Sequence, residues 1–171
     1  LTLSIMLAGL STGTIITMSS THWLMAWAGL ELNTLSIIPI ITKHHHPRST
    51  EATTKYFLIQ AAASALLLFA SVTNAWHTGT WDISQLTNQP ACTMFTMAIS
   101  MKLGLAPLHF WLPEVLQGTS LSTALIISTW QKLAPMALMF LTHNTLNLAV
   151  LMVMGLFSAM VGGWGGLNQT Q

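Results

Sequence analysis

Three charged residues, Glu31, Lys102 and Lys132, each lie near the middle of a long apolar segment of this 171-residue sequence. The chain has only four Asp and Glu and five Lys and Arg, so 5% of its residues are charged while 52% are hydrophobic. Water-soluble domains have about 25% charged residues. The sequence therefore predicts an all-α integral membrane protein, because helices satisfy their own backbone hydrogen bonds in lipid.

Six apolar segments are expected to cross the membrane as a polytopic helical bundle. They run over residues 2–20, 23–42, 49–73, 91–117, 119–141 and 146–167. The first is rich in Gly, Ser and Thr, and such small residues allow close contact between membrane helices. The polar stretch 74–90 is expected to be a loop that places Trp76 and Trp81 at the membrane interface.

The fourth segment is predicted to be a broken helix. Lys102, Gly104 and Pro107 all fall between residues 101 and 107. Proline lacks a backbone N–H donor, and its ring clashes with the preceding helical turn. Backbone groups freed at such a break are tolerated in a membrane only inside protein or beside water. Lys102 is therefore expected to have a polar setting with room for water.

The three buried charges are expected to form a lateral row that handles protons. At about 1.5 Å per residue, Glu31 lies roughly 12 Å from the start of its segment and the two lysines roughly 17–18 Å from theirs, close to half of the ~30 Å hydrocarbon core. A charge at that depth costs about 2.5–3.5 kcal/mol and is rarely kept without a use. Burial favours the neutral form and an opposite charge favours the ionised form, so a Glu31–Lys102 contact would switch the protonation of Lys102. The alternative is that the lysines extend toward the interface without such a role.

Two further residues of the broken segment, Glu114 and His109, are weaker candidates. Glu114 follows Pro113 near a helix end, where it is either a group that takes up protons or an ordinary interfacial acid. Three adjacent histidines at 44–46 rarely converge on one ion, so no metal site is predicted. The single cysteine, Cys92, cannot form an internal disulfide or hold an iron–sulfur cluster alone. The scattered basic residues offer no nucleic-acid-binding face.

Several long motifs carry a family signal. The most specific is Met-Lys-Leu-Gly-Leu-Ala-Pro-Leu-His-Phe-Trp-Leu-Pro-Glu-Val-Leu-Gln-Gly, which contains Lys102 and Glu114. Other motifs lie at 22–34, in the His-His-Pro-Arg loop, and at 51–57, 130–135 and 165–171. Together they resemble the antiporter-like subunits in the membrane arm of respiratory complex I, NADH–ubiquinone oxidoreductase. The resemblance covers essentially the whole chain, and the pattern is similar to vertebrate mitochondrial members.

This resemblance implies an antiporter-like fold of two inverted five-helix repeats, each with a broken helix and a buried lysine. The chain would be a single transmembrane domain over 1–171, with the first repeat at about 1–142 and the start of the second at about 146–171. By the same resemblance, Glu31, Lys102 and Lys132 match the family's buried glutamate, its broken-helix lysine and its connecting residue. The sequence is expected to be a fragment of a longer protein.

The function implied by the resemblance is proton translocation across the mitochondrial inner membrane, coupled to electron transfer from NADH to ubiquinone, as one subunit of an enzyme complex. The chain itself would carry no redox chemistry and bind no cofactor, since NADH, FMN, iron–sulfur clusters and ubiquinone belong to other subunits. Its partners would be other membrane-arm subunits, lipid and protons. Two alternatives stay open: a stand-alone cation/proton antiporter subunit, and a structural scaffold with an idle channel.

Overall fold

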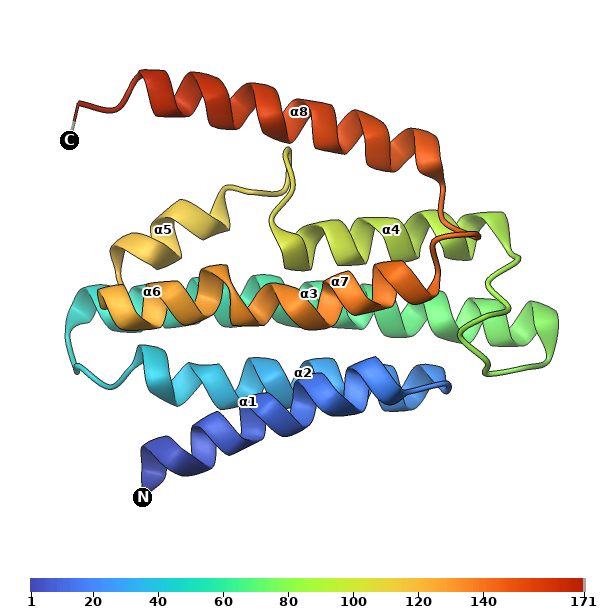
Figure 1. Ribbon diagram of the computed structural model, residues 1–171, viewed down its shortest axis with the longest axis horizontal. Helices are drawn as coiled ribbons and strands as arrows, with labels where there is room; N and C mark the ends of the chain where they lie inside the picture. Colours follow the sequence, from blue (N-terminus) through green and yellow to red (C-terminus); the bar gives the residue numbers. More distant parts are fainter. Residues whose placement is uncertain (171) are drawn as a thin grey trace.

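The computed structural model describes residues 1–170, and these contain eight helices (Figure 1). The helices are α1 (Thr2–Ser19), α2 (Trp23–Ile41), α3 (Pro47–Thr78), α4 (Gln89–Leu103), α5 (Trp111–Gln117), α6 (Leu121–Ser128), α7 (Trp130–Leu141) and α8 (Leu148–Leu167). The predicted all-α fold is confirmed. The predicted break in the fourth segment is confirmed as well, because α4 and α5 are separate helices.

Five stretches are long and apolar enough to cross a membrane: α1, α2, α3, the α6–α7 pair and α8. Exposed side chains such as Leu58, Phe140 and Leu156 suit a lipid-facing surface. α4 has 15 residues and α5 has 7, and at about 1.5 Å per residue neither spans a ~30 Å hydrocarbon core alone. The chain is therefore an integral membrane protein, and the fourth predicted span is divided between α4 and α5.

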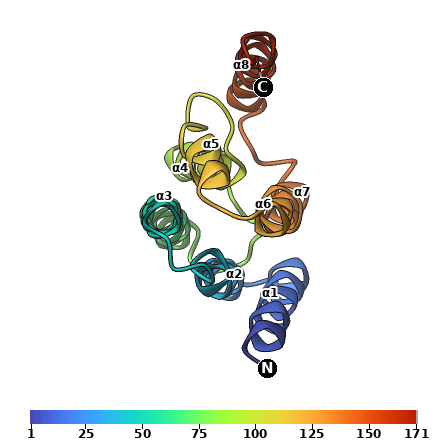
Figure 2. The ribbon, with the colours of Figure 1, turned by 90° about the vertical axis from the view of Figure 1, so that its left-hand side faces the viewer.

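The first seven helices form a bundle with an enclosed interior. α1 packs on α2, α2 packs on α3, and α3 packs on both α4 and α5. α7 closes the bundle by contacting α1, α2 and α4, and the end-on view shows this arrangement (Figure 2). α8 lies at the opposite edge from α1 (Figures 1 and 2), and Met154 is its one buried residue within the described range.

α3 is longer than the sequence suggested, so the prediction of a loop over 74–90 is wrong at its start. The helix continues to Thr78 and ends where Gly79 adopts a left-handed conformation, with φ of 72°, a common way to terminate a helix. Trp76 therefore lies on the exposed surface of α3 rather than in a loop. Trp81 does lie in the loop, where its backbone carbonyl accepts a 3.1 Å hydrogen bond from the Trp23 amide.

The fifth predicted segment is also interrupted, at Thr129 between α6 and α7. Pro135 cannot bond to the carbonyl of Gln131, four residues earlier. The Thr129 hydroxyl donates to the carbonyl of Leu125 at 2.6 Å, a local bond that competes with regular helix geometry. The Lys132 amide consequently bonds to the carbonyl of Thr129, three residues back, at 3.2 Å. The interruption lies three residues before Lys132, which α7 carries.

Small residues bring α1 and α2 into close contact, as the composition of the first segment predicted. A Cβ atom placed at Gly13 would collide with the side chain of Asn33 and the backbone carbonyl of Gly29. A Cβ atom at Gly29 would likewise meet Thr17. Glycine at these positions lets the two backbones approach. The contact fixes the position of Asn33 on α2.

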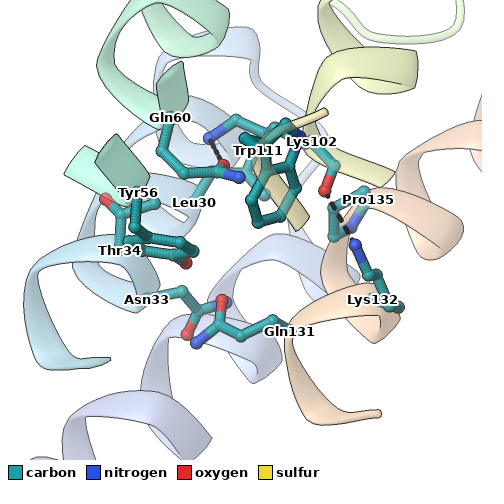
Figure 3. A pocket seen from close by; sticks show the side chains of 10 residues that line it. All are labelled: Leu30, Asn33, Thr34, Tyr56, Gln60, Lys102, Trp111, Gln131, Lys132 and Pro135. Carbon is teal, nitrogen blue, oxygen red and sulfur yellow. Dashed lines mark hydrogen bonds between the residues drawn. The ribbon is translucent and has the colours of Figure 1, made fainter. Parts of the chain in front are cut away.

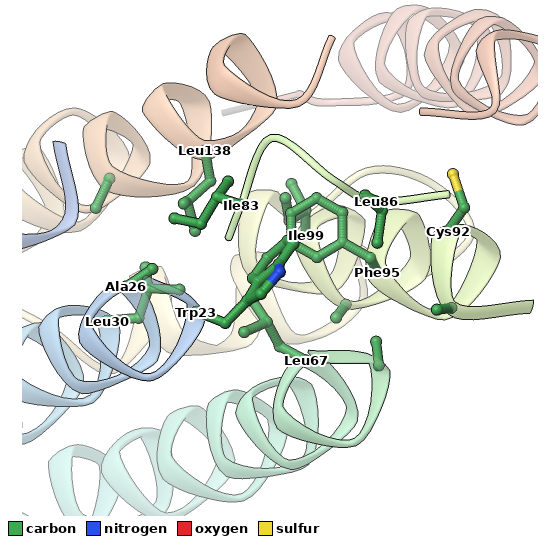
Figure 4. Close-up of a cluster of buried hydrophobic side chains, with 14 residues drawn as sticks. Trp23, Ala26, Leu30, Leu67, Ile83, Leu86, Cys92, Phe95, Ile99 and Leu138 are labelled. Carbon is green, nitrogen blue, oxygen red and sulfur yellow. The ribbon is translucent and has the colours of Figure 1, made fainter. Parts of the chain in front are cut away.

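Two clusters of buried apolar side chains lie toward opposite ends of α2. In the first, Trp23 packs edge-to-face on Phe95 with ring centroids 5.1 Å apart (Figure 4). In the second, Tyr56 packs on Trp111 in the same way at 5.8 Å. Aromatic pairs of this kind add about 0.5–1.5 kcal/mol beyond their buried area. The two clusters enclose a polar layer at the middle of α2.

Candidate functional site

A small polar cavity lies inside the bundle between the two apolar clusters (Figure 3). Its volume available to water centres is about 10 Å³, close to what one water molecule needs. Helices α2, α3, α4, α5 and α7 all contribute to its lining. The lining residues are Leu30, Asn33, Thr34, Tyr56, Gln60, Lys102, Trp111, Gln131, Lys132 and Pro135. The structure thus brings two of the predicted site residues, Lys102 and Lys132, to one cavity.

Lys102 lies in the last turn of α4 and is 3% exposed. Its Nζ donates to Oε1 of the buried Gln60 on α3 at 3.4 Å (Figure 3). Between residues 1 and 170, the ion pairs within 4 Å all involve Lys55, so Lys102 has no carboxylate at that distance. An ammonium group has three N–H donors. The Gln60 bond leaves donors of Lys102 free for water in the cavity.

The end of α4 is shaped by Gly104, which has φ of 76°. Such a left-handed residue closes a helix with bonds from the following amides. The amides of Gly104 and Leu105 donate to the Ser100 carbonyl at 2.9 and 3.0 Å. The indole Nε1 of Trp111, at the start of α5, donates to the Met101 carbonyl at 3.1 Å. Trp111 therefore ties the two halves of the broken helix together.

Lys132 reaches from α7 to the same helix end. Its Nζ donates to the Leu103 carbonyl at 2.7 Å and to the Lys102 carbonyl at 3.3 Å (Figure 3 shows Lys132 beside Lys102). The same nitrogen lies 4.9 Å from the centroid of the Trp111 ring, within the range of a cation–π contact. A cation at a helix C-terminus also interacts favourably with the helix dipole. Lys132 is thus bound to the backbone of the residue that it was predicted to neighbour.

Two amide side chains face the cavity from α2 and α7 with unused hydrogen-bonding capacity (Figure 3). Asn33 is 2% exposed, and neither atom of its amide has a hydrogen-bond partner among residues 1–170. Nε2 of Gln131 is also buried without a partner there. Buried amides left unpaired cost about 1–3 kcal/mol each, and buried water commonly pairs with such groups. The Asn33 and Gln131 side chains therefore make the cavity suited to water.

The other predicted site residues lie outside the lining of this cavity. The hydroxyl of Thr34, which lines the cavity, donates to the backbone carbonyl of Glu31 at 2.8 Å and to Oε2 of the same residue at 3.1 Å. Glu114 is at the bundle surface, where its carboxylate lies 2.6 Å from Lys55. His109 stacks on the neighbouring Phe110 in the loop between α4 and α5, and its buried Nδ1 lacks a partner within the part of the protein that the structure describes.

Sequence reasoning missed four residues of the site: Asn33, Gln60, Trp111 and Gln131. Three of them are amides embedded in apolar segments, a signal that was present but weaker than a full charge. Amides cost less to bury than charges, so they occur in membrane helices for packing as well. The indole N–H of Trp111 left no sequence signal, because its bond depends on how the backbone reverses after the break.

The family model described as NADH:quinone oxidoreductase/Mrp antiporter, TM, matches residues 20–171. The chain belongs to this family. The NADH-ubiquinone oxidoreductase chain 2 of Xenopus laevis is 61% identical over 171 residues, which is 100% of this chain and 50% of that protein. The protein of the same name from Struthio camelus is 63% identical over 167 residues, which is 98% of this chain and 48% of that protein. The chain spans about half the length of the curated relatives it matches.

Solved structures show the same fold. A subunit of respiratory complex I from Thermus thermophilus with bound aureothin superposes with a TM-score of 0.90 at 26% identity, covering 98% of this chain and 40% of that one. A subunit of the Mrp complex from Dietzia sp. DQ12-45-1b has a TM-score of 0.67 at 16% identity, covering 76% and 27%. The family predicted from the motifs is therefore confirmed, and the helices are arranged as in these membrane complexes.

Proposed function

We propose that this chain belongs to a complex I membrane-arm subunit that translocates protons across the mitochondrial inner membrane, driven by electron transfer from NADH to ubiquinone. One observation carries the proposal. Two lysines, the buried Lys102 and the half-buried Lys132, line one polar cavity at a helix break in the middle of the bundle. Relatives named NADH-ubiquinone oxidoreductase chain 2 support the same assignment.

The chemistry of the cavity suits a group that alternately holds and releases a proton. A buried lysine can lose its proton at accessible pH, which an arginine cannot do. Gln60 offers an acceptor to Lys102, and the unpaired amides of Asn33 and Gln131 offer partners to water. A proton released from either lysine would pass to water in the cavity rather than to lipid. The two lysines are the proposed proton carriers.

Glu31 is proposed to influence the charge of Lys102, although it does not line the cavity itself and contacts it through Thr34. Its carboxylate is hydrogen-bonded to the Thr34 hydroxyl, and Thr34 lines the cavity. At an effective dielectric of about 20, opposite charges about 4 Å apart attract by about 4 kcal/mol. Movement of this carboxylate toward or away from Lys102 would therefore change the proton affinity of the lysine. Glu114 and His109 are proposed as secondary groups at the surface and at the break.

The remaining parts of the assignment follow from the same relatives. The electron carriers NADH, FMN and iron–sulfur clusters, together with ubiquinone, would bind to other subunits, and lipid and neighbouring membrane-arm subunits would surround this chain. Helices α1–α7 would form the first inverted repeat, at about 1–142. Helix α8 would open the second repeat, which is supported by its separation from the bundle.

The decisive experiment replaces Lys102 by Met in the full-length protein within its complex. We expect the number of protons pumped per electron to fall, because the cavity loses a proton carrier. Lys43→Met is the matched control, since Lys43 is exposed at the end of α2 and should leave the ratio unchanged. An assembled Lys102→Met complex with a normal ratio would contradict the proposal.

A stand-alone cation/proton antiporter is the second candidate, because the matching family includes Mrp antiporters. Cation transport by the full-length protein in vesicles that contain no other subunit would favour it. A structural scaffold with an idle channel is distinguished by the same variants. For a scaffold, substitutions at Glu31, Lys102 and Lys132 would reduce the amount of assembled complex but never the proton-to-electron ratio.

A further inference from the structure

The four carbonyls at the end of α4 have no partners within the helix itself, as at any helix C-terminus. At membrane depth such groups must be satisfied by protein or water. The carbonyls of Ser100 and Met101 accept hydrogen bonds from backbone amides and from Trp111. The carbonyls of Lys102 and Leu103 accept hydrogen bonds from Lys132 Nζ. We propose that the Lys132 ammonium group caps the C-terminal end of the broken helix, and that loss of its proton loosens the backbone that holds Lys102.

The geometry suits a charged cap. One ammonium group reaches two consecutive carbonyls at 2.7 and 3.3 Å and lies over the Trp111 ring at 4.9 Å. Hydrogen bonds from charged donors are roughly twice as strong as neutral ones, and the helix dipole adds to the attraction. Three contacts thus all hold the ammonium group of Lys132 at this helix end. Its position on α7 couples that helix to the break in α4.

Loss of the proton changes this cap without abolishing it. The neutral amine keeps two N–H donors, enough for both carbonyls, but it loses its attraction to the dipole and to the Trp111 ring. Its new lone pair accepts from Nε2 of Gln131 or from water in the cavity, which draws the amine away from the helix end. The Lys102 carbonyl is one of the two groups that are then bound more weakly, so the Lys102 side chain can shift relative to Gln60.

The groups that can influence this titration come from every helix around the cavity. Lys102 on α4 and Tyr56 on α3 share the lining with Lys132. Glu31 on α2 is hydrogen-bonded to Thr34, which lines the cavity. The described parts of α1 and α6 contain no Asp, Glu, His, Lys or Arg, and Glu114 of α5 is paired with Lys55. The cap itself stands on the geometry, whereas its release during turnover rests on the proposed function.

Hydrogen–deuterium exchange of the intact complex tests the cap directly. In Lys132→Met, amides of residues 104–112 should exchange about tenfold faster or more, because two buried carbonyls lose charged partners. Trp111→Phe removes the bond to Met101 but keeps an aromatic ring and the Lys132 cap, so it should give a smaller increase. Lys43→Met should give none. Unchanged exchange at 104–112 in an assembled Lys132→Met complex would overturn the proposal.

A second measurement decides the matter if Lys132→Met does not assemble. In the wild-type complex, exchange at 104–112, corrected for its intrinsic pH dependence, should rise as Lys132 loses its proton. In Lys132→Arg the charge is permanent, so the corrected exchange should stay flat. Curves of the same shape in both proteins would refute the coupling. Normal proton pumping by Lys132→Arg would instead count against Lys132 as a proton carrier, and would leave the cap intact.

Discussion

Lys55 Nζ lies 2.6 Å from a carboxylate oxygen of Glu114, which ties the second half of the broken helix to the first turns of α3. The same nitrogen lies 2.8 Å from Glu51, one turn earlier on α3. A Cβ atom placed at Gly118 would collide with Ala52 and the Arg48 carbonyl, so α5 also packs tightly on α3 here. α5 is thus held to α3 by both charge and close packing, while Trp111 and Lys132 hold the end of α4.

Replacing Glu114 by Gln should cause a small loss of thermal stability that disappears in high salt. All three side chains are partly exposed, and exposed ion pairs contribute little and are screened when the Debye length falls to about 3 Å near 1 M salt. Glu51→Gln is the matched control, because that pair lies within α3 and does not connect two helices. The thermal midpoint of the complex at low and high salt provides the measurement. A larger effect of Glu51→Gln would show that the link to α5 is unimportant.

Replacing Gly104 by Ala should destabilise the protein by about 1–2 kcal/mol, the cost of a left-handed conformation for a residue with a Cβ atom. Gly104→Asn should cost less, because asparagine tolerates this conformation better. A Cβ atom at this position has no neighbour closer than 3.5 Å, so the backbone conformation alone is tested. Denaturant or thermal unfolding of both variants gives the comparison. Equal costs for Ala and Asn would indicate that φ at Gly104 is not the constraint.

Replacing Gln60 by Glu should slow proton pumping by holding Lys102 in its charged form. A carboxylate about 4 Å away at an effective dielectric near 20 adds about 4 kcal/mol of attraction, a bias of roughly a thousandfold. The proton-to-electron ratio and the coupled rate of NADH oxidation are the readouts. Gln117→Glu introduces the same change at an exposed position of α5 and should have no effect. Normal pumping by Gln60→Glu would mean that Lys102 need not lose its proton.

Replacing Asn33 by Leu should reduce proton pumping without reducing stability. The change removes two buried polar atoms that lack partners among residues 1–170, and replacing such groups by apolar atoms is often neutral or stabilising. The cavity would then hold water less well. Asn74→Leu is the control, since Asn74 is buried outside the cavity and donates to the Gln85 carbonyl at 2.9 Å. That variant should lose stability yet pump normally once assembled, whereas the opposite pattern would contradict the role of Asn33.

The sequence was sufficient to predict the class of fold and most helices. Long apolar segments with almost no charge indicate membrane helices, because a helix satisfies its own backbone hydrogen bonds where lipid offers no partners. The motif around Lys102, Gly104 and Pro107 also located the break correctly. The end of α3 at Thr78 and the interruption at Thr129 were missed. Each depends on local backbone geometry, in the polar stretch 74–90 for Thr78 and in the apolar segment 119–141 for Thr129.

The sequence by itself determined that the chain is a helical membrane protein, and it predicted that Lys102 and Lys132 lie at a depth where a charge is costly. Only the tertiary structure decided which groups surround them. A helix that is apolar on nearly every side carries little periodic signal for the face that turns inward. The bond from Lys102 to Gln60, and the capping of α4 by Lys132, therefore depend on how the helices are rotated and packed. That packing places Lys132 against the backbone of Lys102. It leaves Glu31 outside the cavity lining, where it is hydrogen-bonded to the lining residue Thr34.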